Sequence, residues 1–377
     1  MDGLRGVAIT MVLLAHASGT FPSGYSRWLY PLRGFFNGEY GVEIFFVLSG
    51  YLITSILIRE YDAIGKIDIK AFYYRRIFRI FPAFYLFLFL IAVLDWMRVL
   101  KIPGTELAFA GSHLINYGRA IILLFKIHAP ASPDYWFVGQ FWSLSLEEQF
   151  YWMWPLTLLV LLRTRWYSIL MAVILAMPVI RLSSYYLFPE LRGQLMMMLH
   201  TASDGIFSGC ILAICLAWHP HFSKKLLLSP WAVAGLVFYI YWVDPFVGDA
   251  MPRGFGVVLG ATLVIAAIAL IIANVLLQEG RTWYHRLLES GVLVSLGRTS
   301  FSIYLWQQMF LTPLNTTFLG KWPINLVGAI VTGWMSYRYI ELPFIRLKDR
   351  YFPSHGKATA PISAAAATVP SPSTSVR

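Results

Sequence analysis

The chain has 377 residues, of which 58% are hydrophobic and 13% are charged. A soluble domain carries about 25% charged residues, so the composition excludes an ordinary soluble fold and predicts an all-α, polytopic transmembrane helical bundle. The net charge of +11 does not indicate nucleic-acid binding, because Lys and Arg are spread over short loops between apolar stretches. Cys210 and Cys215 lie in one apolar stretch and predict neither a disulfide framework nor a metal site.

Ten stretches approach the roughly 20 apolar residues that a helix needs to cross a bilayer. They are residues 4–20, 41–59, 78–98, 138–162, 166–187, 195–218, 230–244, 255–277, 292–312 and 322–342. Lys and Arg are more numerous in the segments that share a side with the N-terminus, which places both termini in the cytoplasm. We expect residues 1–350 to form one transmembrane domain. Residues 351–377 are rich in Ala, Ser, Pro and Thr and predict a disordered tail.

The first stretch, residues 2–16, is apolar but contains Arg5 and His16. Eleven residues make almost three helical turns, so the two side chains share a face and lie roughly 16 Å apart along the axis. Ionisable groups inside a membrane usually face a protein interior or a wet cavity. The pattern predicts a polar track in which His16 handles protons. The alternative is that Arg5 flanks the span on the cytoplasmic side and His16 is an interfacial histidine.

Two further stretches add charged side chains. Glu43 lies at the outer end of the second stretch, as an interfacial carboxylate or as part of a site, while Ser49 and Gly50 suit close helix packing. In residues 71–85, Arg76 and Arg79 are three apart and share a helix face. Paired guanidinium groups suit phosphate binding, although a cluster that binds lipid headgroups has the same pattern.

The stretch 140–155 places Ser143, Glu147 and Tyr151 four residues apart, on one helix face. A carboxylate there is costly unless it is paired or protonated. Together with an imidazole in the same cavity, Glu147 would form an acid–base pair. The alternative is a structural pair between Glu147 and an intramembrane arginine.

The end of the chain carries polar residues inside apolar stretches. Tyr304 and Gln308 share a helix face, and Gln307 and Gln308 need hydrogen-bond partners. Glu341 precedes Pro343 near the end of a helix, and we expect it to form a structural salt link near Arg338.

Six sequence blocks resemble the successive signatures of the acyltransferase 3 family, which consists of bacterial-type integral membrane enzymes that acylate surface and secreted glycans. The blocks occur in the order of the family and extend over residues 2–347. They are DGLRG followed by His16, GVEIFFVLSGYLIT, RRIFRIFP, WSLSLEEQFYWMWP, TSFSIYLW and YIELPF.

The resemblance implies roles for particular residues. Arg5 and His16 match an Arg-x10-His motif whose histidine is regarded as catalytic. Arg76 and Arg79 match an Arg-x-x-Arg motif associated with the acyl-CoA donor, and Glu147 matches the carboxylate of the Trp-Ser-Leu-x-x-Glu block.

The chain departs from the family pattern in three respects. Gln307 stands where many members have histidine. Relatives usually have several residues before the segment MDGLRG, which predicts a start codon further upstream. A soluble hydrolase-like domain follows the last span in some relatives, and we expect none in this chain.

The resemblance therefore implies a membrane enzyme of the bacterial inner membrane. It would transfer an acyl group, acetyl in the simplest case, from acyl-CoA to a hydroxyl group of a glycan or glycan-lipid acceptor. His16 would be the general base or acyl carrier, Glu147 would orient it, and Arg5, Arg76 and Arg79 would bind the donor. Candidates for acceptor binding or support are Glu43, Ser143, Tyr151, Tyr304 and Gln307.

We expect acyl-CoA, the glycan acceptor and membrane lipid as partners, with no bound cofactor, no metal and no nucleic acid. A non-catalytic transporter or flippase of a glycan or lipid is the alternative class, since it also needs charged groups among many spans.

Overall fold

A computed structural model gives the arrangement of the chain. It describes residues 1–22, 30–128, 132–219, 227–250, 256–278 and 282–352. Within these ranges the regular elements are all helices and no strand occurs, which confirms the predicted all-α class. The expected tail over 351–377 falls almost entirely outside the described residues.

The helices have the following bounds. The first half of the chain contains α1 (Asp2–Ser18), α3 (Gly38–Ile64), α4 (Ile69–Trp96), α5 (Gly104–Gly111), α6 (Gly118–Phe125), α7 (Trp136–Gly139), α8 (Phe141–Thr164) and α9 (Ser168–Leu187). The second half contains α10 (Leu199–Ala202), α11 (Asp204–Trp218), α13 (Pro230–Phe238), α14 (Asp244–Ala250), α16 (Ala261–Leu277), α17 (Trp283–Leu288), α18 (Gly291–Trp306), α19 (Ile324–Ser336) and α20 (Leu342–Tyr351). Short π-helical segments join α13 to α14, precede α16 and join α19 to α20.

Five helical segments of the described chain are long and apolar enough to cross a membrane. They are Gly38–Ile64, Ile69–Trp96, Ser168–Leu187, Pro230–Gly248 and Val258–Leu277. The chain is accordingly an integral membrane protein. The remaining predicted spans contain helices that are shorter or less apolar, such as α1 with 17 residues and α11 with 15. The count of ten spans and the cytoplasmic position of the termini stay predictions.

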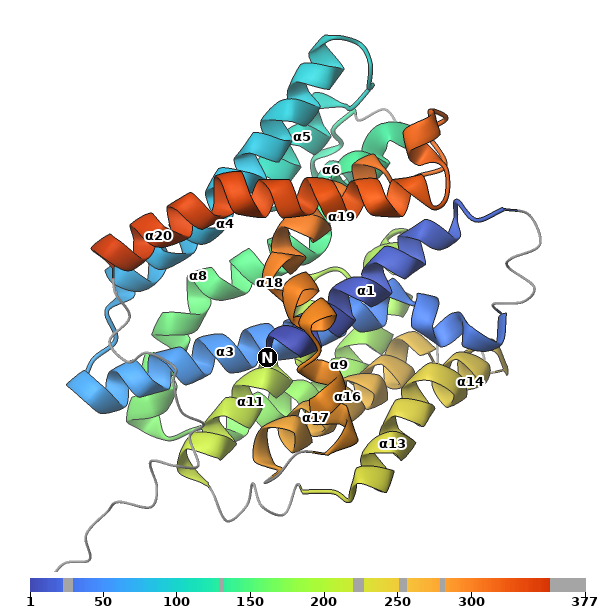
Figure 1. Ribbon diagram of the computed structural model, residues 1–377. Coiled ribbons are helices and arrows are strands. Elements are labelled where there is room, and N and C mark those ends of the chain that lie inside the picture. Colours follow the sequence, from blue (N-terminus) through green and yellow to red (C-terminus); the bar gives the residue numbers. More distant parts are fainter. Residues whose placement is uncertain (23–29, 129–131, 220–226, 251–255, 279–281, 353–377) are drawn as a thin grey trace, which may run out of the picture.

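Helix α1 occupies the middle of the bundle, where it packs against α3 and α18 (Figure 1). Helix α11 packs on α3, α19 covers α18, and α20 lies along α4. Glycine permits the closest of these approaches, because a Cβ atom on Gly50 would lie 1.9 Å from the Ile206 carbonyl oxygen, and one on Gly297 would lie 1.8 Å from that of Asp2. Small residues at such contacts let membrane helices approach closely, so these glycines set how α1, α3, α11 and α18 meet.

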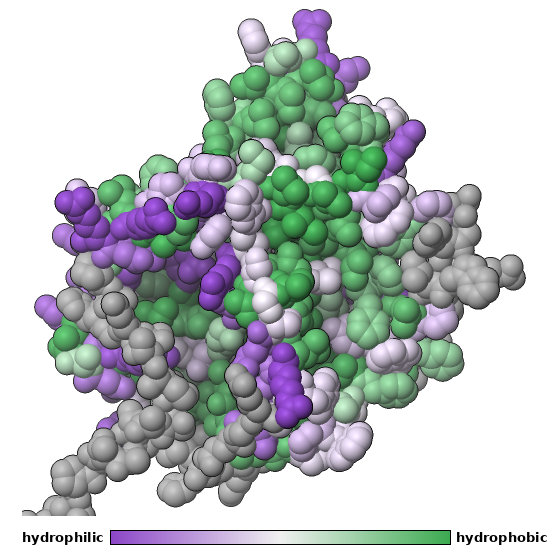
Figure 2. Space-filling model, in the orientation of Figure 1, coloured by the Kyte–Doolittle hydropathy of each residue, from purple (hydrophilic) through white to green (hydrophobic). Residues whose placement is uncertain are grey.

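The surface agrees with a protein embedded in lipid. Figure 2 shows mostly hydrophobic side chains over the projecting end of α4 and α5, whereas hydrophilic side chains gather around the free end of α20. Large apolar side chains are exposed along α4 and α9, among them Phe89 and Leu175. In water such exposed apolar residues would be unfavourable, but they suit contact with acyl chains.

Candidate functional site

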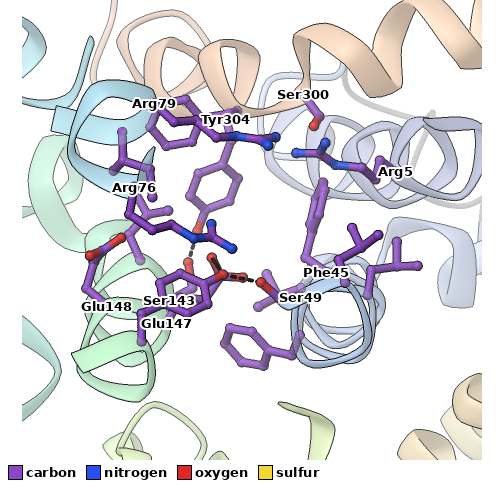
Figure 3. A pocket seen from close by; sticks show the side chains of 18 of the residues that line it. Arg5, Phe45, Ser49, Arg76, Arg79, Ser143, Glu147, Glu148, Ser300 and Tyr304 are labelled. Atoms are coloured by element: carbon purple, nitrogen blue, oxygen red, sulfur yellow. Dashed lines mark hydrogen bonds between the residues drawn. The ribbon is translucent and has the colours of Figure 1, made fainter. Parts of the chain in front are cut away.

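A cavity of about 220 Å³ opens among α1, α3, α4, α8 and α18, and we call it the arginine cavity. Its described lining residues include Arg5, Ser49, Arg76, Arg79, Ser143, Glu147, Glu148, Tyr151, Ser300 and Tyr304. Figure 3 shows side chains from these separate helices converging on one space. The structure therefore brings together all three arginines that the sequence singled out for donor binding.

The three arginines share the cavity without a carboxylate bonded to any of them. Among the described residues, no hydrogen bond or salt bridge involves the guanidinium groups of Arg5, Arg76 or Arg79. The guanidinium groups of Arg5 and Arg79 point toward one another (Figure 3). Arg79 experiences the positive charges of Arg5 and Arg76 and the opposing charge of Glu341. Like charges held this close favour a bound anion.

Local interactions fix which arginines face the cavity. Arg75 lies on another face of α4 and forms a 3.1 Å ion pair with Glu60. The guanidinium carbon of Arg76 lies 4.1 Å from the centre of the Tyr151 ring. A cation over an aromatic face is favourable, so this contact holds Arg76 while its N–H donors remain available.

The predicted face of α8 is confirmed, because Ser143, Glu147 and Tyr151 all line the arginine cavity. The Tyr151 hydroxyl donates to the Glu147 carboxylate over 3.2 Å, and it also contacts the hydroxyl of Ser49. Ser49 thus contributes to the cavity, although the sequence suggested only a packing role for it.

A second, larger cavity of about 820 Å³ contains His16, and we call it the histidine cavity. Its described lining residues include His16, Arg33, Glu39, Tyr40, Trp136, Gln140, Trp142, Asp244, Tyr304 and Gln308. The His16 and Trp136 rings pack edge to face, with their centres 5.4 Å apart. Arg5 and His16 therefore face different cavities, one near each end of α1.

The partner of His16 is Gln307, and not Glu147 as we expected. The His16 Nδ1 atom lies 2.9 Å from the Gln307 Oε1 atom, and Gln307 is fully buried. Glu147 lines the arginine cavity, while Gln140 on the turn before α8 lines the histidine cavity. Seven helical residues span about 10 Å, which explains why Glu147 lies away from the imidazole.

Tyr304 forms the wall between the two cavities and, with Val42, lines both of them. Its hydroxyl lies 2.9 Å from the Gln140 carbonyl oxygen and 2.6 Å from the Ser143 hydroxyl. Since a carbonyl oxygen only accepts, Tyr304 donates to Gln140 and accepts from Ser143. The arginine and histidine cavities therefore meet at a phenol ring held by two hydrogen bonds.

Glu43 lies in a third cavity of about 200 Å³, which we call the Glu43 branch. The branch shares lining residues with the histidine cavity, namely Asn37, Glu39, Tyr40, Trp142, Met197 and Asp244. Glu43 is only 8% exposed and faces Gly205, where a Cβ atom would lie 2.5 Å from its Oε2 atom. It is therefore a buried cavity carboxylate rather than a group at the membrane surface.

Several residues of these cavities were not selected from the sequence. Asp244 accepts a 2.5 Å hydrogen bond from Tyr40, and fully buried Arg181 forms a 2.5 Å ion pair with Asp204 beside Glu43. Each is a charge within or next to an apolar stretch, which is the available sequence signal. Glu341 accepts a 2.9 Å hydrogen bond from Ser302 and acts electrostatically on Arg79, which replaces the expected link near Arg338.

Comparison with known proteins gives one consistent result. A family model for an acyltransferase domain, the acyltransferase 3 model, matches residues 1–337. The O-acetyltransferase OatA of Staphylococcus aureus strain NCTC 8325 / PS 47 is 29% identical over 384 residues, covering 91% of this chain and 56% of the relative. The putative O-acetyltransferase SACOL0978 of Staphylococcus aureus strain COL is 27% identical over 383 residues, with the same coverage. The chain thus spans about half the length of these relatives. No solved structure matches it.

Proposed function

Because the chain belongs to the acyltransferase 3 family, we propose that it transfers an acyl group from acyl-CoA to a hydroxyl group of a glycan or glycan-lipid acceptor. Acetyl is the simplest acyl group and agrees with the names of the O-acetyltransferase relatives. The observation that carries the proposal is the meeting of two chemically different cavities at Tyr304. One cavity suits an anionic donor and the other presents a histidine.

The arginine cavity is the proposed donor site. Coenzyme A carries several phosphate groups, which guanidinium groups bind through paired hydrogen bonds. Arg5, Arg76 and Arg79 have such donors free among the described residues. His16 lies roughly 16 Å further along α1 than Arg5, a span that an extended pantetheine arm can bridge. The thioester would then pass Tyr304 to reach the imidazole.

His16 is the proposed general base. With Gln307 Oε1 accepting from Nδ1–H, the Nε2 atom has its lone pair free. Nε2 takes the proton from the acceptor hydroxyl, the hydroxyl oxygen forms a bond to the thioester carbonyl carbon, and the carbon–sulfur bond breaks. The proton then passes to the CoA thiolate, so CoA leaves as a thiol. Transfer through a transient acyl-histidine needs the same groups and is the alternative route.

We assign the side of Arg5 to the cytoplasm and the histidine cavity to the outer side of the bacterial inner membrane. A donor from the cytoplasm and an acceptor from outside would then meet within the bundle. Glu147 lines the arginine cavity and accepts a hydrogen bond from Tyr151, so its proposed role is to hold the donor-side groups in place.

The test uses the protein in lipid nanodiscs with acetyl-CoA and oligosaccharide acceptors, and it measures release of free CoA thiol. General base catalysis contributes about 10²–10⁴-fold, and His16→Ala should lower acceptor-dependent release by that factor. His200→Ala is the matched control, because His200 contacts Tyr117 outside both cavities. Near-normal release by His16→Ala would refute the proposed role. Movement of a glycan across vesicles without CoA release would identify a flippase instead.

A further inference from the structure

Buried polar atoms without partners surround the histidine cavity and the Glu43 branch. They are Gln140 Oε1, Gln308 Oε1, Trp136 Nε1 and Glu43 Oε2. A buried polar atom without a partner is unfavourable unless water or a ligand pairs with it. The two glutamine oxygens can only accept hydrogen bonds, and so can Glu43 Oε2 when Glu43 is ionised. A partner for these three atoms therefore has to supply hydrogen-bond donors.

The orientation of the Gln140 amide follows from its surroundings. Its Nε2 atom donates to the Leu305 carbonyl oxygen over 2.9 Å, and a flipped amide would set two oxygen atoms against each other. The Oε1 atom is therefore the one left for a ligand. Gln140 is 3% exposed and Gln308 is 4% exposed, so both amides are fixed by packing near His16.

Glu43 offers a third acceptor, and no hydrogen bond from a neighbouring cation reaches its Oε2 atom. The nearby guanidinium of Arg181 already donates to the Thr201 carbonyl oxygen, to Thr262 and to Asp204. The Glu43 Oε2 atom is left without a partner in the branch.

The histidine cavity and the Glu43 branch together form what we call the combined space, whose lining carries more negative than positive side chains. Its described lining residues include the carboxylates Glu39, Glu43 and Asp244, whereas Arg33 is the lining arginine and no lysine lines it. Carboxylates in a partly enclosed space repel an anionic ligand. Aromatic rings of Tyr40, Trp136 and Trp142 complete the walls, and such rings suit the apolar faces of sugars.

We propose that this combined space selects an acceptor glycan without acidic substituents near the acylated hydroxyl. The sugar donates its hydroxyl or N–H hydrogens to Gln140, Gln308 and Glu43, and the hydroxyl to be acylated lies at His16. Uronic acids and phosphorylated sugars are excluded by charge. This inference rests on the proposed function and specifies its substrate class.

The first experiment compares acceptors of equal length but different charge. Protein in nanodiscs receives acetyl-CoA with a neutral N-acetylglucosamine tetramer, its deacetylated cationic form, or a galacturonic acid tetramer, and free CoA and acetylated product are measured. We expect kcat/KM for the acidic tetramer to be at least tenfold lower than for both others. Preference for the acidic tetramer would overturn the inference while leaving the proposed function intact. A lack of His16-dependent CoA release with every acceptor would refute the proposed function itself.

The second experiment tests the individual residues. Gln140→Leu and Gln308→Leu should each raise the acceptor KM by about tenfold, since each removes one hydrogen bond to the sugar, and they should leave the KM for acetyl-CoA unchanged. Gln140→Leu also removes the bond to the Leu305 carbonyl oxygen, so Gln308→Leu is the cleaner of the two variants. Gln278→Leu, at the end of α16, is the matched control. Glu43→Gln keeps the shape of the side chain but removes its charge. It should reduce the difference in kcat/KM between the neutral and the acidic acceptor. An unchanged acceptor KM in both leucine variants, or an unchanged preference in Glu43→Gln, would contradict the inference.

Discussion

The arginine cavity and the histidine cavity meet at the same tyrosine, yet the balance of charged side chains that line them differs. Among the described residues, three arginines and two glutamates, Glu147 and Glu148, line the first cavity. Three carboxylates and one arginine line the second together with its branch. A cavity that keeps unpaired charge favours a ligand of the opposite charge or one that can supply the missing hydrogen bonds. The contrast separates the two substrates of the proposed reaction by electrostatics rather than by size.

Single arginines also differ in whether their N–H donors are already bonded within the protein. Arg181 is fully buried and has three hydrogen-bonding partners, whereas Arg76 keeps its N–H donors free over the Tyr151 ring. Arg181 therefore belongs to the framework, and Arg76 is available to a ligand.

The largest effect should come from Arg76→Ala combined with Arg79→Ala. A hydrogen bond to a charged group contributes about 1.5–3 kcal/mol, so the KM for acyl-CoA should rise by roughly 100-fold or more. Steady-state kinetics at saturating acceptor measure this rise. Arg75→Ala is the control, because Arg75 pairs with Glu60 outside the cavity. A change confined to the acceptor KM would contradict the assignment of the cavities.

Arg181→Ala should instead destabilise the fold, because it leaves Asp204 buried without its cation. The expected loss is about 3–5 kcal/mol, measured by denaturant unfolding in detergent micelles. Arg181→Met combined with Asp204→Leu should recover part of that loss. Arg298→Ala provides the comparison, since its ion pair with Asp2 is exposed and contributes only about 0–1 kcal/mol. If Arg181→Ala and Arg298→Ala lowered the free energy of unfolding equally, the buried ion pair would contribute no more than the exposed one, which would contradict this prediction.

Gln307→Ala should lower kcat by about tenfold through the loss of one hydrogen bond to His16, with little change in the KM for acyl-CoA. Gln307→His should retain more activity than Gln307→Ala, because an imidazole nitrogen can also accept from Nδ1–H. Initial rates over a range of donor concentrations distinguish kcat from KM. Equal activity of wild type and Gln307→Ala would show that His16 needs no such partner.

Tyr304→Phe should have the smallest effect, a few-fold change in rate, because the ring that separates the cavities remains and only the bonds to Gln140 and Ser143 are lost. Tyr304→Ala removes the wall itself and should increase CoA release in the absence of acceptor. A thiol assay without acceptor compares the two variants, and identical behaviour would argue against a separating role for the ring.

Sequence alone determined the features that depend on local periodicity and composition. The apolar content predicted the all-α membrane fold, and helical spacing correctly placed Arg76 with Arg79, and Ser143 with Glu147 and Tyr151. Those relations follow from 3.6 residues per turn within one helix. The catalytic role of His16 and the donor role of the arginines stay predictions.

Only the tertiary structure decided which helices face each other. Gln307 lies 291 residues from His16 in the chain yet contacts it, while Glu147 lies in the other cavity. Periodicity fixes the face of a helix but not its neighbour, which depends on packing such as the close contacts at Gly50 and Gly297. For the same reason, the presence of two cavities with different balances of charge became visible only once α1, α3, α8 and α18 were placed together.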